Sequence, residues 1–256
     1  MGTYGRTPRD GWVCDVLGLW RLTRAGRVVA LPPRDQRLVA LLLIEGRKPR
    51  SQLAGLLWPN SSEARAQANL RSTALDLRAR APGLIESHEG TLGLAGVVDS
   101  DLYRLRAALD GSGPGRTAVE QSEYLMGVRQ LLPGWYDDWL LGERRRLDEL
   151  VLDRMSRVLE VLIEEQQSGY ALPLVRAAIE REPMRESAHR ALARVHLLSG
   201  DRIAAWQVYV DFRHRSITEF GVAPSHQFDE LMEPLRAERR ARRVDGPGAE
   251  GGAGHP

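Results

Sequence analysis

Apolar and polar residues alternate along the start of the chain in a pattern that predicts a strand pair followed by a helix. Residues 12–22 and 27–31 are short segments rich in valine, leucine and tryptophan, and the polar residues between them favour a β-hairpin. Two prolines then lead into residues 34–45, whose leucines predict a helix with one buried side that ends at Gly46.

The next fifty residues predict two more helices and a second hairpin. Ser51 is a candidate N-cap for a short helix over residues 52–58, and Ser62 is one for a longer helix that reaches about Arg80. Residues 84–94 contain two short apolar segments joined by a turn, as in a hairpin. This order is that of a winged helix-turn-helix, in which the third helix enters the major groove of DNA and the hairpin, or wing, lies along the backbone or in the minor groove.

The third predicted helix has an apolar stripe and an opposite face suited to DNA. On a helical wheel, Ala66, Ala74 and Leu77 lie within about 40° of Leu70. The opposite face has small residues that allow close approach, and polar and arginine side chains that can contact phosphates or base edges. A solvated face is the alternative, but residues 47–80 contain seven basic residues against two acidic ones. The candidate DNA-binding residues are Arg50, Arg65, Asn69, Arg71, Ser72, Thr73, Arg78 and His88.

From residue 99 onward the pattern predicts helices and no strands. Helices are expected over residues 101–110, about 118–132 and about 137–167, and a loop rich in glycine at 111–116 separates the first two. We therefore expect a mainly α protein with an α+β winged helix-turn-helix domain at residues 10–98, an all-α tetratricopeptide-like domain at 99–240 and a disordered tail at 241–256.

A repeat in the second half supports the tetratricopeptide interpretation. Tetratricopeptide repeats recur every 34 residues, with small and bulky residues at fixed offsets. A shift of 34 aligns Ala171 with Ala205, and Val175 with Tyr209. It also aligns Leu159 with Ala193, Leu162 with His196, and Ala178 with Phe212. Such repeats stack helix pairs and present a surface to partner proteins. A coincidental match between amphipathic helices is the alternative.

Charge and composition narrow the class of protein. Residues 1–98 contain 14 basic and 8 acidic residues, a net charge of +6, and the remainder carries −4. A basic first half favours contact with nucleic acid, although +6 over 98 residues is within ordinary variation. No stretch approaches the roughly 18 apolar residues that cross a bilayer, and residues 1–10 lack the apolar core of a signal peptide. The single cysteine, Cys14, excludes an intramolecular disulfide, so we expect a cytoplasmic protein without a membrane partner.

The sequence contains no catalytic motif. A P-loop motif and the HExxH and GxSxG patterns are all absent. His189 and His196 are seven residues apart with no third metal ligand supplied by the helix between them, and His196 is expected to pack into the core. We therefore expect no enzyme, no cofactor and no metal site.

Short motifs occur in order along both halves of the chain: Leu17–Gly18, Arg37–Leu42, Leu56–Pro59, Ala68–Arg71, Leu75–Arg78, Leu132–Trp135, Glu143–Leu147 and Phe220–Pro224. In their order and spacing the chain resembles the SARP (antibiotic regulatory protein) family of bacterial transcriptional activators over about residues 13–239. It implies a response-regulator-type winged helix that binds direct repeats near a promoter's −35 region and recruits RNA polymerase. The expected partners are double-stranded DNA and RNA polymerase, through its sigma factor, with a homodimer on DNA.

A protein-interaction adaptor is the alternative, in which the winged helix binds protein rather than DNA. The third helix is less rich in polar and basic residues than in many members of the family. The wing at residues 87–91 has His88 and no arginine, which predicts a weak contact with the DNA backbone.

Overall fold

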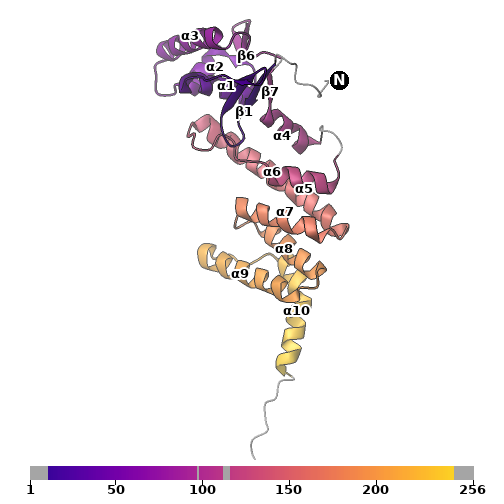
Figure 1. The fold of residues 1–256 in the computed structure, drawn as a ribbon. Coiled ribbons are helices and arrows are strands. Elements are labelled where there is room, and N and C mark those ends of the chain that lie inside the picture. The colour runs from indigo at the N-terminus through magenta and orange to yellow at the C-terminus, as the bar shows by residue number, and fades with distance from the viewer. Residues whose placement is uncertain (1–10, 97, 112–115, 245–256) are drawn as a thin grey trace, which may run out of the picture. The chain divides into compact units, whose positions relative to one another are not determined.

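The structure is a computed structural model that describes residues 11–96, 98–111 and 116–244. It divides into two compact units (Figure 1). Unit 1 comprises residues 1–115 and 128–150, and unit 2 comprises residues 116–127 and 151–256. The compact units differ from the predicted domains, because residues 99–115 and 128–150 belong to unit 1. The domain boundary between residues 98 and 99 stays a prediction.

Unit 1 begins with a four-stranded sheet of order β3-β2-β1-β7. Its strands are β1 (Trp12–Asp15), β2 (Arg21–Arg24), β3 (Arg27–Val28) and β7 (Val98–Ser100). β1 pairs with β2 antiparallel and with β7 parallel. The single strand predicted over residues 12–22 is wrong, because the chain turns between β1 and β2 at Gly18, whose φ of +94° an L side chain rarely adopts. The absence of strands expected from residue 99 is also wrong, because β7 reaches Ser100.

Three helices and a second sheet complete the winged helix. The elements are α1 (Pro33–Glu45), β4 (Lys48–Pro49), α2 (Arg50–Leu57), α3 (Glu63–Arg80), β5 (Ile85–His88) and β6 (Thr91–Leu94). β5 and β6 form the predicted second hairpin, and β4 joins it to give the order β4-β6-β5. Figure 1 shows α1, α2 and α3 gathered at one end of unit 1. The winged helix-turn-helix fold is confirmed.

The observed helix ends agree with some of the predicted capping residues and differ from others. Gly46 ends α1 with a φ of +74°, as expected for a residue without a side chain. Ser62 is the N-cap residue of α3, but its side chain accepts no hydrogen bond from the helix. The predicted cap at Ser51 is wrong, because α2 begins at Arg50, two residues before the predicted start, and its N-cap residue is Pro49. Pro49 lies opposite Thr91 in the β4–β6 pair, so the sheet fixes the start of α2.

Residues beyond 98 complete unit 1. The carboxylate of Asp101, at the start of α4 (Asp101–Asp110), accepts hydrogen bonds from the backbone N–H of Val16 and of the next residue, at 2.9 Å each. Arg144 donates hydrogen bonds to three carbonyl oxygens of the loop at residues 131–135. A fragment that ends at residue 98 would lose these contacts and β7. Experiments on the winged helix therefore need the full chain.

Unit 2 is helical. Its helices are α5 (Ala118–Met126), the second part of α6 (Asp138–Glu164), α7 (Ser168–Arg181), α8 (Glu186–Leu198), α9 (Arg202–Phe220) and α10 (His226–Val244). α5 is shorter than predicted, because Gly127 ends it with hydrogen bonds to the last turn and residue 128 already belongs to unit 1. Residues 241–244 of the predicted disordered tail are helical, and residues 245–256 lie outside the described residues.

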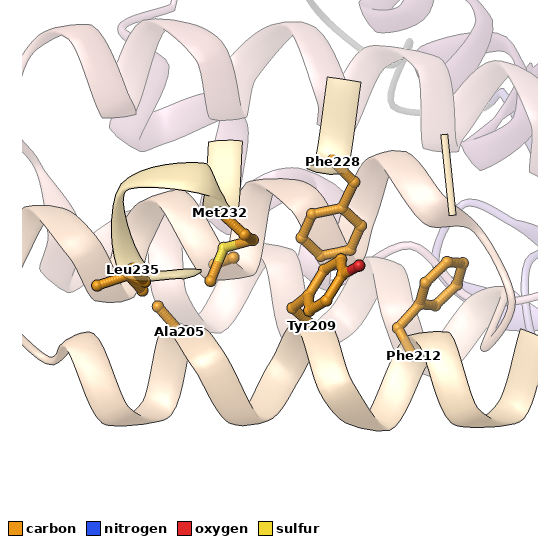
Figure 2. Close-up of a cluster of buried hydrophobic side chains, with 7 residues drawn as sticks. Ala205, Tyr209, Phe212, Phe228, Met232 and Leu235 are labelled. Atoms are coloured by element: carbon orange, nitrogen blue, oxygen red, sulfur yellow. The ribbon is translucent and has the colours of Figure 1, made fainter. Parts of the chain in front are cut away.

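Most of the residues aligned by the 34-residue repeat lie in the core of unit 2. Ala171, Val175 and Ala205 are 0% exposed and Tyr209 is 1% exposed. The ring of Tyr209 meets that of Phe228 edge-on, with centroids 5.1 Å apart and planes at 84° (Figure 2). α10 thereby covers the buried side of α9. The tetratricopeptide-like helical fold of this part is confirmed.

His189 is the buried histidine of the repeat, whereas His196, which we expected in the core, is only half-buried. The Nε2 atom of His189 lies 2.9 Å from the carbonyl oxygen of Pro183, and its ring centroid is 4.8 Å from that of Phe212. Burial lowers the pKa of His189 below its ordinary value of 6.5; the hydrogen bond to Pro183 opposes this shift, and the charge of Arg215 adds to it.

Unit 2 is expected to lose stability as the pH falls below about 6.5, because the unfolded chain then binds a proton that folded His189 resists. The stability linked to neutral His189 is complete above the unfolded pKa and declines as the pH falls toward the lower folded pKa. Urea unfolding followed by circular dichroism between about pH 5 and 8 measures this. The change His189→Gln should flatten the dependence, whereas exposed His214→Gln should leave it intact. A wild-type stability that does not change with pH would contradict the assignment.

Candidate nucleic-acid interface

α3 is held in unit 1 by the predicted apolar stripe. The stripe packs against α1 and α2, and its residues are at most 3% exposed: Ala66, Leu70, Ala74 and Leu77. At the end of the helix, Arg80 donates a hydrogen bond of 2.9 Å to the buried carboxylate of Asp35 on α1. With one side fixed in this way, the residues on the other side of α3 are directed to solvent.

The exposed face of α3 carries two arginines that have no intramolecular partner. Arg65 and Arg71 are exposed, and neither forms a hydrogen bond or ion pair with any residue in the described part of the chain. The small residues Ala68, which lies between them in sequence, and Ser72, which directly follows Arg71, are also exposed. This arrangement leaves both guanidinium groups available for the forked contacts that arginine makes with phosphate and guanine.

Three further residues affect the polarity and charge of this face. Leu75 is 68% exposed, so it is available for an apolar contact such as that with a thymine methyl group. Asn69 is half-buried. Asp76, whose carboxylate would repel phosphates, forms an ion pair of 2.5 Å with Arg34 of α1. This pairing reduces the unfavourable charge on the face.

Thr73 is not part of the candidate interface, and its prediction as a DNA-binding residue is wrong. Its side chain is 0% exposed, and its hydroxyl donates a hydrogen bond of 2.8 Å to the carbonyl oxygen of Asn69 one turn earlier. The reason is its position: it lies three residues after Leu70 and four before Leu77, at the edge of the apolar stripe.

Arg50 and Arg78 contact the wing. Both donate to the hydroxyl oxygen of Ser87 on β5, Arg50 at 2.8 Å and Arg78 at 2.5 Å. A third arginine, Arg47, forms an ion pair with Glu86 of the same strand. These contacts attach the wing to the start of α2 and the end of α3. Since a guanidinium group has five N–H donors, Arg50 and Arg78 keep donors for a phosphate.

The tip of the wing, residues 88–91, contains no arginine or lysine. His88 is exposed, and its Nε2 atom lies 3.7 Å from the carboxylate of Glu89, which is also exposed. Glu86 is on the same strand, although Arg47 balances its charge. The structure therefore places His88 at the surface but adds no arginine beside it, in line with the weak backbone contact expected from the sequence.

No group of three or more histidine, cysteine, aspartate or glutamate side chains in the described residues is placed to hold a metal ion. No described helix is long and apolar enough to cross a membrane. Cys14 is buried, and burial together with the charges of Asp101 and Asp15 raises the pKa of its thiol, which makes it a poor nucleophile.

Comparisons with known proteins connect this architecture to a family. The structure of Mycobacterium tuberculosis EmbR in complex with a low-affinity phosphopeptide is similar to the chain, with a TM-score of 0.70 and 19% identity over 91% of this chain and 68% of that one. At this identity the likeness establishes the fold. The family described as the bacterial transcriptional activator domain matches residues 121–236. This family match covers somewhat less than half of the chain.

The family match and the winged helix occupy different parts of the chain. The bacterial transcriptional activator domain extends from α5 into α10 and contains the tetratricopeptide-like helices. The winged helix precedes it and carries the exposed face of α3. A search of curated proteins finds no match to the sequence.

Proposed function

We propose that the chain is a SARP-type transcriptional regulator that binds DNA in a sequence-specific manner, with α3 in the major groove. The observation that carries the proposal is the exposed face of α3, where Arg65 and Arg71 have no partner in the described chain and the small residues Ala68 and Ser72 are exposed near them in sequence. Arginine side chains on an accessible helix face suit guanine edges and phosphates. Such a face has no evident use in a helix that only supports a fold.

Arginines beside the wing are available for a second contact, with the DNA backbone. Ser87 holds Arg50 and Arg78 beside it, and phosphate contacts of this kind position a protein without selecting sequence. We propose that the regulator activates transcription by binding direct repeats near a promoter as a homodimer and holding RNA polymerase there through its sigma factor. A regulator of this kind acts in the cytoplasm, where the bacterial chromosome is, and needs no catalytic site or cofactor.

The experiment that tests DNA binding selects bound sequences from a random library with the full chain and then measures affinity by gel shift. The selected sequence is expected to bind much more tightly than random DNA, and the logarithm of the binding constant should fall linearly with the logarithm of salt concentration. A probe with two tandem half-sites should bind more tightly than a probe with one. Equal affinity for one and two half-sites would contradict the tandem arrangement.

A protein-binding adaptor is the second candidate function, because tetratricopeptide-like helices present surfaces to partner proteins. The same selection separates the two. An adaptor would enrich no sequence, and its retention on DNA would be weak even at low salt.

A further inference from the structure

An open groove lies between α9 and α10 in unit 2. Its volume is about 700 Å³, and it is lined by residues of both helices and of the turn between them. The turn contributes Pro224, which is buried. Two of the α9 residues in the groove, Val210 and Ile217, are 42% and 43% exposed. The groove thus has apolar side chains that nothing in the described chain covers.

These apolar residues belong to a stripe along α9. Ile203, Val210 and Ile217 follow one another at intervals of seven residues, and Ile203 is 74% exposed. Residues seven apart lie on the same side of a helix, two turns from each other. The stripe is therefore about 21 Å long, from 14 residues at 1.5 Å each. That length matches four turns of a second helix laid beside it.

Arginines line the groove from both of its helices. Arg213 comes from α9 and has no hydrogen-bond or ion-pair partner among the described residues. Arg239 comes from α10, and its guanidinium lies 4.7 Å from the ring centroid of Trp206 without a carboxylate partner in the described chain. By contrast, Arg236 donates to Asp229 at 2.8 Å, so its charge is balanced within the groove. The uncompensated charge in the groove is positive.

We propose that this groove binds an acidic amphipathic helix of a partner protein. The apolar side of such a helix would cover Val210 and Ile217, and its carboxylates would reach Arg213 and Arg239 on the two walls. The positive charge of the groove favours an acidic partner. The exposed apolar stripe favours an amphipathic helix over DNA, because a phosphate backbone forms no favourable contact with valine and isoleucine side chains. The proposal does not depend on DNA binding by α3, which lies in the other unit.

The test uses the full chain and a fluorescently labelled synthetic peptide of about 18 residues, or five helical turns. Leucines occupy one face of the peptide and glutamates the other, and a control peptide carries lysine at every glutamate position. Fluorescence anisotropy is expected to show binding of the glutamate peptide at least tenfold tighter than that of the lysine peptide. Arg213→Glu and Ile217→Asp should each weaken it on the order of tenfold. Arg157→Glu, a change at an exposed arginine of α6, should alter it less than about twofold.

A second measurement locates the peptide. Because Cys14 is buried, Thr218→Cys adds a single accessible thiol to the groove, where an environment-sensitive dye can be attached. Its emission should change on addition of the glutamate peptide, and that of a dye at Arg157→Cys should not. Equal binding of the two peptides, or an Arg213→Glu variant that binds as the wild type does, would overturn the proposal. So would a loss of DNA affinity or of self-association caused by Arg213→Glu, since the groove would then serve DNA or a second copy of the chain.

Discussion

The change Ala205→Arg is expected to destabilise unit 2 by about 4 kcal/mol or more. Ala205 is 0% exposed and lies in the cluster closed by α10 (Figure 2). The other buried members of this cluster are Ala193, Tyr209, Phe212, Phe228, Met232 and Leu235. An arginine at this position must either bury an unpaired charge or push α10 away from α9. Both are costly because protein interiors are closely packed and a buried charge without a partner loses its hydration.

Urea unfolding of the full chain, followed by circular dichroism, measures this loss. Ala237→Arg is the matched control, because Ala237 is an exposed alanine on α10 and should accept arginine with a change within about 0.5 kcal/mol. Comparable unfolding curves for Ala205→Arg and Ala237→Arg would show that the packing described for this cluster is wrong.

The functional consequence of Ala205→Arg separates the roles of the two units. Unit 1 does not contain Ala205, so the variant is expected to keep binding DNA through α3. In vitro transcription from a promoter that carries the selected sequence should nevertheless fall to the basal rate, because unit 2 no longer offers a folded surface to a partner. Normal activation by a variant with an unfolded unit 2 would show that activation does not need this unit.

Local signals were sufficient to predict α3 and the wing. Ser62 before α3 and the Pro82-Gly83 pair after it mark the ends of the helix, which the structure places at Glu63 and Arg80. The wing was predicted from two apolar segments around a turn, and β5 and β6 occupy those residues. In each case the deciding interactions lie within a few residues along the chain.

Features that depend on distant contacts were not predictable in this way. β7 is three residues long and exists because it pairs with β1, more than 80 residues earlier. The contact of Arg50 and Arg78 with Ser87 likewise joins three separate elements. Thr73 is different, because its spacing from Leu70 and Leu77 already placed it beside the apolar stripe. Its hydroxyl suggested a polar role, but that group is satisfied by a backbone carbonyl inside the helix.

Replacing Arg71 with alanine is expected to weaken binding to the selected DNA sequence by roughly 1–3 kcal/mol and to have little effect on random DNA. Arg71 is exposed and has no intramolecular partner in the described chain, so its removal breaks no contact of the folded protein. Asn69→Ala is expected to behave in the same way if its amide reads a base. Affinity for both DNAs, measured by gel shift at one salt concentration, gives the specific and the non-specific loss separately.

Two control variants make the result on Arg71 interpretable. Thr73→Val replaces a buried residue of the same helix with one of similar shape, so it should leave the ratio of specific to non-specific affinity unchanged even if it costs some stability. Arg157→Ala removes an exposed arginine from unit 2 and tests whether any loss of positive charge weakens DNA binding. If Arg71→Ala weakens binding to selected and random DNA equally, Arg71 contacts only phosphate, and sequence selection must come from elsewhere on α3. If Arg157→Ala weakens DNA binding as much as Arg71→Ala does, the exposed face of α3 is not the DNA-binding surface.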